Sequence, residues 1–80
     1  MDLHLREQLE ELGRRLHLHR GAGEERAGAL RADVQRALDD DEHHGLVDRL
    51  EEEAVEFETD HPDLAAFLRQ AANTLSAAGI

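Results

Sequence analysis

The sequence predicts an all-α protein of three to four short amphipathic helices, packed as antiparallel helical hairpins in a coiled-coil-like arrangement. Leu, Ala, Glu and Arg dominate the composition and favour helices, whereas three Val and one Ile give little support for strands. Leucines also recur at helical spacing. Because 80 residues form one small domain at most, we expect residues 1–80 to be a single helical domain.

The first two predicted helices span about residues 3–19 and 24–40, and together they should form one hairpin. In the first, Leu5, Leu9, Leu12 and Leu16 step by four, three and four residues, so they share one stripe. The RGAG segment then ends this helix, since glycine suits the left-handed conformation found at helix ends. The second helix repeats the pattern with the apolar stripe Ala27, Leu30, Val34, Ala37 and Leu38.

A third helix is expected over about residues 46–58, after the acidic segment DDDEHHG at 39–45. That segment fits either a loop or a kink in a longer helix, and both remain open. The helix has an apolar stripe that ends at Phe57. Its outer face is almost wholly acidic, with Glu51, Glu52, Glu53, Glu56 and Glu58.

The fourth helix, about 62–78, differs because Arg69 is its only charged side chain between Leu64 and Ile80. A surface helix normally has a charged back, so this one should be covered on more than one side, by its own chain or by another copy. Its neutral surface is more than one small chain can cover. We therefore expect a homo-oligomer, with a dimer favoured, in which this helix contacts another copy and completes the packing. Its predicted contact residues are Phe67, Leu68 and Leu75.

The ends of the fourth helix carry their own signals. His61 should be the N-cap and Pro62 the first helical residue, where its missing N–H costs nothing. At the other end, Gly79 fits the left-handed position of a Schellman motif and Ile80 can pack on Leu75. The residues assigned structural roles are Phe57, His61, Pro62, Leu64, Gly79 and Ile80.

Charge and composition exclude several function classes. The net charge is −10, and residues 39–80 hold twelve acids against Arg49 and Arg69, which disfavours direct binding of nucleic acid. No apolar run is long enough for a membrane span, and the first residues do not resemble a signal peptide, so a cytoplasmic location is expected. The absence of cysteine excludes disulfides and thiolate metal ligands.

Catalysis is not expected, and neither is a cofactor. The only hydroxyl side chains are Thr59, Thr74 and Ser76, and none has the His and acid spacing of a triad. The GAG segment at 21–23 lacks the lysine and the strand context of a phosphate loop. The sequence therefore predicts a protein that is not an enzyme.

Six histidines suggest metal binding as the alternative function, with Glu58, His61, His43 and His44 as the candidate ligands. Glu58 and His61 have the Glu-x-x-His spacing of helical di-iron sites, but Pro62 keeps His61 out of a continuous helix. His17 and His19 make a poor chelate, because residues two apart on a helix point in nearly opposite directions. Surface or capping histidines are the preferred interpretation.

The segment FETDHPDLAAFLRQAANTLSAAGI, residues 57–80, resembles the closing signature of domain-of-unknown-function family 4404, a group of small bacterial proteins. The matching residues are Phe57, Glu58, His61, Pro62, Leu64, Leu75, Gly79 and Ile80. The LREQLEELGRRL and LRADVQRAL segments are similar to the family's first two helices, whereas residues 20–25 depart from its usual helix start. The resemblance implies a helical fold and brings no activity, ligand or catalytic residue.

The acidic patch spanning residues 39–63 has two interpretations. It can keep a small oligomer soluble, or it can dock a basic protein or mimic nucleic acid. We predict a non-catalytic, oligomeric protein–protein interaction module with the acidic face at residues 39–58 as the docking surface. A small His/carboxylate metal-binding protein is the alternative.

Overall fold

The computed structural model describes residues 2–41 and 43–80. This part of the chain contains four α-helices and no strand. They are α1 (Leu3–Leu18), α2 (Glu24–Asp40), α3 (Leu46–Phe57) and α4 (Pro62–Ala77). The all-α prediction is confirmed. The predicted range 24–40 coincides with α2, whereas 3–19, 46–58 and 62–78 each extend one residue beyond the observed helix.

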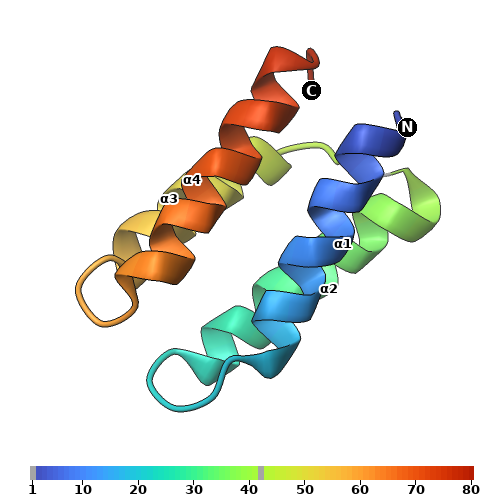
Figure 1. Ribbon diagram of the computed structural model, residues 1–80. Helices are drawn as coiled ribbons and strands as arrows, with labels where there is room; N and C mark the ends of the chain where they lie inside the picture. Colours follow the sequence, from blue (N-terminus) through green and yellow to red (C-terminus); the bar gives the residue numbers. More distant parts are fainter. Residues whose placement is uncertain (1, 42) are drawn as a thin grey trace.

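The helices form two antiparallel hairpins that lie side by side (Figure 1). α1 packs on α2 and α3 packs on α4, while α1 against α4 and α2 against α3 join the hairpins. The α1–α2 and α3–α4 turns lie at one end, and both termini lie with the α2–α3 connection at the other (Figure 1). This places residues 19–23 and 58–61 beside each other. Coiled-coil-like packing and oligomerisation remain predictions.

Every helix contributes leucines to one core. Six of them are fully buried, namely Leu9, Leu12, Leu30, Leu50, Leu68 and Leu75. The radius of gyration is 11.4 Å, close to the value of about 11.6 Å that is typical of a folded chain of this length. A single copy of the chain therefore encloses its own core.

The prediction that Leu68 and Leu75 contact a partner was wrong for this conformation, because both are completely buried inside their own chain. Alanines on α4 are buried as well: Ala65, Ala71 and Ala72. The contacts of α4 with α3 and α1 cover these positions. The neutral composition of α4 thus reflects close packing within one chain and gives no reason to require a second copy.

The ends of α4 have the predicted geometry. His61 is the N-cap, without a side-chain capping bond, and Pro62 is the first helical residue. At the other end, the Ile80 N–H donates to the Leu75 carbonyl at 3.1 Å and the Gly79 N–H donates to Ser76 at 3.0 Å. These are the two hydrogen bonds of a Schellman motif.

The connection after α2 is a true break. α2 ends at Asp40, Asp41 adopts a left-handed conformation with φ 55°, and α3 begins after Gly45. A kink in one longer helix is therefore excluded. Glu42, part of the predicted acidic segment, lies outside the described residues.

The two ends of α4 should respond differently to substitution. Gly79 has φ +86°, so Gly79→Val should destabilise the protein by about 1–2 kcal/mol through the left-handed backbone. Pro62→Ala should cost less than about 1 kcal/mol, since alanine fits the first helical turn and only the unfolded chain gains freedom. Thermal unfolding of both variants measures the difference, and a larger loss for Pro62→Ala would contradict it.

Candidate functional site

The outer side of α3 carries exposed acids around an apolar residue. We call Glu51, Glu52, Val55 and Glu56 the acidic α3 face; all four are exposed, Val55 to 62%. Within the described part of the chain, Glu51 and Glu52 form no ion pair. A small groove of about 230 Å³ in this region is lined by Glu51, Val55, Arg69 and Asn73. The face therefore offers both negative charge and an apolar contact point.

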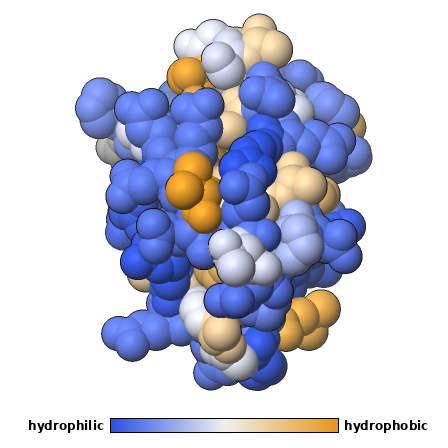
Figure 2. Space-filling view, turned by 90° about the vertical axis from the view of Figure 1, so that its left-hand side faces the viewer, coloured by the Kyte–Doolittle hydropathy of each residue, from blue (hydrophilic) through white to orange (hydrophobic). Residues whose placement is uncertain are grey.

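Hydrophilic residues dominate the side of the molecule where α3 and α4 run. Figure 2 shows this side, and its apolar residues stand as separate small spots within a hydrophilic surface. Stable contacts between copies usually need a contiguous apolar patch. This view offers none, so a partner bound here has to match charge as well as apolar shape.

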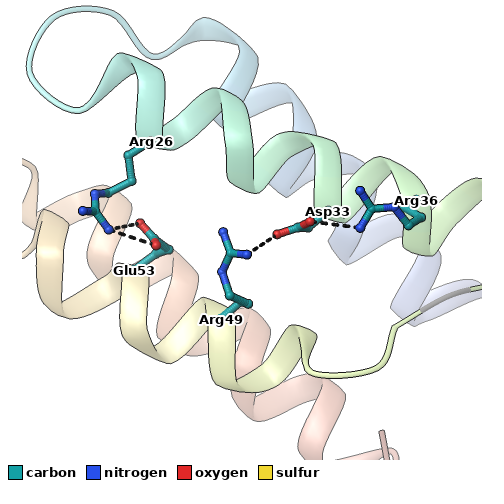
Figure 3. A network of polar contacts seen from close by, with 5 residues as sticks. All are labelled: Arg26, Asp33, Arg36, Arg49 and Glu53. Atoms are coloured by element: carbon teal, nitrogen blue, oxygen red, sulfur yellow. Dashed lines mark hydrogen bonds and ion pairs between the residues drawn. The ribbon is translucent and has the colours of Figure 1, made fainter.

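Glu53 does not belong to this face, which corrects its prediction as a contact residue. It is only 4% exposed and points toward α2, where Arg26 Nη1 donates to both of its carboxylate oxygens at 3.0 Å (Figure 3). The hydrogen bond to Glu53 is the main cause that raises the pKa of the Arg26 guanidinium above its usual value. Arg26 also lies 3.7 Å from Glu56. Glu53 therefore joins the two hairpins.

A second ion-pair cluster continues the contact between α2 and α3. Arg49 Nη1 lies 2.9 Å from Asp33 Oδ2, and Arg36 Nη1 donates to Asp33 Oδ1 at 3.1 Å (Figure 3). An open groove of about 670 Å³ runs beside Arg26, Arg49 and Glu53. Because each of its arginines is already bound to a carboxylate, the groove presents no uncompensated cation for an anionic ligand.

The predicted metal ligands are dispersed. Glu58 Oε1 lies 2.7 Å from Arg69 Nη2, and His43 Nε2 lies 4.0 Å from Asp41 Oδ1. His43 and His44 belong to the α2–α3 connection, at the opposite end of the bundle from His61 (Figure 1). Among the described residues, no three side chains of His, Asp or Glu stand together as metal ligands. The structure therefore does not bring the four candidates into one site.

His61 instead meets His19, a pairing that the sequence analysis missed. α1 ends at Leu18, one residue earlier than predicted, and His19 is an extended C-cap. Its Nε2 lies 2.7 Å from the Ala22 carbonyl oxygen, and His61 Nε2 lies 3.1 Å from the same oxygen. The two rings meet edge to face, with centroids 4.4 Å apart.

Phe57 supports both imidazole rings. It is 2% exposed, and its centroid lies 5.3 Å from that of His19 and 6.2 Å from that of His61. We call His19, Ala22, Phe57 and His61 the histidine cluster. It ties the turn after α1 to the turn before α4. The only sequence signal for it was the pair of glycines around Ala22, which allow the tight turn.

The remaining predicted residues lie in or against the core. Phe57 and Leu64 are buried, and Ile80 packs against the core from the end of α4. Phe67 is partly buried, with the Arg15 guanidinium 4.2 Å from its ring centroid. Phe67 thus joins α4 to α1 within the chain.

Comparison with known proteins identifies a matching family. The family model described as "Domain of unknown function (DUF4404)" matches residues 5–80. No curated protein and no solved structure matches the chain. Within the described residues, no helix is both long and apolar enough to cross a membrane.

Proposed function

The chain belongs to the DUF4404 family, and on that premise we propose that it is a non-catalytic interaction module whose acidic α3 face docks a basic partner protein. The observation that carries the proposal is the exposure of Glu51 and Glu52 beside Val55, with no cation of the described chain bound to either acid. A partner with Lys or Arg around an apolar side chain complements this arrangement in charge and shape.

Charge distribution supports a basic partner. Twelve of the nineteen acids lie in residues 39–80, which hold only two of the nine cations. Such an excess speeds the approach of a cationic partner and repels anions such as nucleic acid. Solubility alone would not require an exposed valine in the middle of the acids. Self-association, with a dimer favoured, stays a separate prediction because one chain encloses its own core.

A defined probe tests the docking directly. We expect a synthetic amphipathic helix, with Lys and Arg flanking a Leu stripe, to bind the protein with an affinity that falls as salt rises. The double variant Glu51→Lys/Glu52→Lys should abolish binding. The matched control Glu7→Lys/Glu10→Lys makes the same charge change at exposed positions of α1 and should retain most of the affinity for the peptide. Fluorescence anisotropy of the labelled peptide is the measurement.

Two outcomes would contradict the proposal. Equal losses in the two double variants would show that only net charge matters. Equal binding of a scrambled peptide of the same composition would show that the apolar contact at Val55 plays no part.

A further inference from the structure

Two imidazoles from opposite hairpins converge on one backbone oxygen in the histidine cluster. His19 follows α1 and His61 precedes α4, yet both Nε2 atoms lie within 3.1 Å of the Ala22 carbonyl oxygen. A carbonyl oxygen only accepts hydrogen bonds, so in this state both Nε2 atoms carry protons. Two nitrogen atoms and one oxygen atom are thus gathered around one small volume, although 42 positions separate the two histidines along the chain.

The spacing of these atoms suits metal coordination. Zn²⁺ binds imidazole nitrogen at about 2.0–2.1 Å, which places neighbouring ligand atoms of a tetrahedral site about 3.3 Å apart. The two nitrogen-to-oxygen distances here are 2.7 and 3.1 Å. A cation bound to the nitrogens and the oxygen would therefore require both nitrogen-to-oxygen distances to lengthen, the shorter one by about half an ångström. Each imidazole would then carry its proton on Nδ1 and offer the Nε2 lone pair.

The surroundings hold the rings while leaving them accessible. Phe57 packs against both imidazoles from the core side. On the other side, an open pocket of about 450 Å³ is lined by both histidines with Asp60, Asp63 and Arg15. A water molecule from this pocket could supply a fourth ligand. Rings fixed by packing and open to solvent on one side are what a preorganised site requires.

We propose that His19 Nε2, His61 Nε2 and the Ala22 carbonyl oxygen bind a divalent transition-metal cation such as Zn²⁺ or Ni²⁺. Imidazole nitrogen is a preferred ligand of these ions. The cation clamps the α1–α2 turn to the start of α4 and so joins the two hairpins at one end. This site is separate from the acidic α3 face, and it differs from the ligand set that the sequence suggested by replacing Glu58, His43 and His44.

Zinc titration of the full-length chain tests the site. After treatment with a chelator and dialysis, ZnCl₂ binding is measured by calorimetry and by thermal melting at about 100 µM metal, since a ligand of the native state raises its stability. The variants His19→Gln and His61→Gln retain a side-chain amide that can donate to Ala22. Each variant should weaken zinc affinity by about tenfold or more, because loss of an outer-shell partner alone lowers metal affinity roughly 10–100-fold.

Controls separate this site from other histidines. His17→Gln alters an exposed residue of α1 and should bind zinc like the original chain. Long-range ¹H–¹⁵N spectra of the unsubstituted protein give a readout independent of the folding of any variant: zinc should shift the Nε2 resonances of His19 and His61 selectively.

The outcomes are distinct. No melting shift and no imidazole shift at about 100 µM zinc would overturn the proposal. Zinc binding that the two Gln variants leave unchanged, or shifts confined to His43 and His44, would also overturn it. Peptide binding at the acidic α3 face does not enter either readout, so the two proposals can fail independently.

Discussion

Replacing Leu68 by Ala should lower the free energy of unfolding by about 2–5 kcal/mol, which is the usual cost of removing a buried leucine side chain. Leu68 is fully buried where α4 meets the rest of the chain, so the substitution leaves a cavity that close-packed neighbours fill only in part. The total stability of a domain is about 5–15 kcal/mol, so a loss of this size should be plain in urea unfolding.

Leu3→Ala is the matched control, because it makes the same chemical change at a residue that is 67% exposed. It should change stability by less than about 0.5 kcal/mol. Light scattering coupled to size-exclusion chromatography on the same samples shows whether Leu68 acts as a core residue or as a contact residue between copies. If Leu68→Ala instead left unfolding unchanged and turned a dimer into a 9.0 kDa monomer, Leu68 would be a contact residue between copies after all.

The helices could be predicted from the sequence because their signals are local. Leu5, Leu9, Leu12 and Leu16 repeat with the period of a helix, and all four are buried in the structure. Pro62 and Gly79 fix the ends of α4 through backbone constraints that act at single residues. Such signals need no knowledge of how the helices pack.

The sites could not be predicted in the same way, because they depend on how the two hairpins are placed. Glu53 looked like one more acid on an outer face until the contact of α2 with α3 set it against Arg26, 27 residues away. The His19–His61 pair depends on both this placement and the exact end of α1. A helix one residue longer would carry His19 on its surface, where it could not share Ala22.

The neutral face of α4 has two physical explanations. A helix without charges can be covered by another molecule, or it can be covered by its own chain when its residues are small enough for close approach. The second case applies to α4, because three of its alanines are buried against α1 and α3, namely Ala65, Ala71 and Ala72. Composition does not distinguish the two cases, because it states that a face is covered and not what covers it.

Gly23→Ala should lower the free energy of unfolding by about 2–5 kcal/mol, from two separate causes. Gly23 precedes α2 with φ +81°, a left-handed conformation that costs an alanine about 1–2 kcal/mol. A Cβ atom at this position would also lie 2.6 Å from Cε1 of Phe57, a ring that is packed in the core. The ring has to move, and displaced core side chains typically cost about 1–3 kcal/mol.

Gly45→Ala isolates the first cause, the left-handed backbone. Gly45 precedes α3 with a similar φ of +76°, and a Cβ atom there would meet nothing within 4 Å. This variant should therefore show only the backbone cost of about 1–2 kcal/mol. Chemical denaturation of both variants gives the difference between their free energies of unfolding. Equal losses of stability would mean that the Phe57 ring moves aside at no cost in free energy.

The same pair of variants links the fold to the histidine cluster. Phe57 is the side chain that holds the rings of His19 and His61, so its displacement by Gly23→Ala should also disturb their approach to Ala22. The zinc affinity proposed for this cluster should then fall in Gly23→Ala and persist in Gly45→Ala, measured by calorimetry where both proteins are folded. If both variants bound zinc equally well, the packing of Phe57 would have no part in positioning the imidazoles.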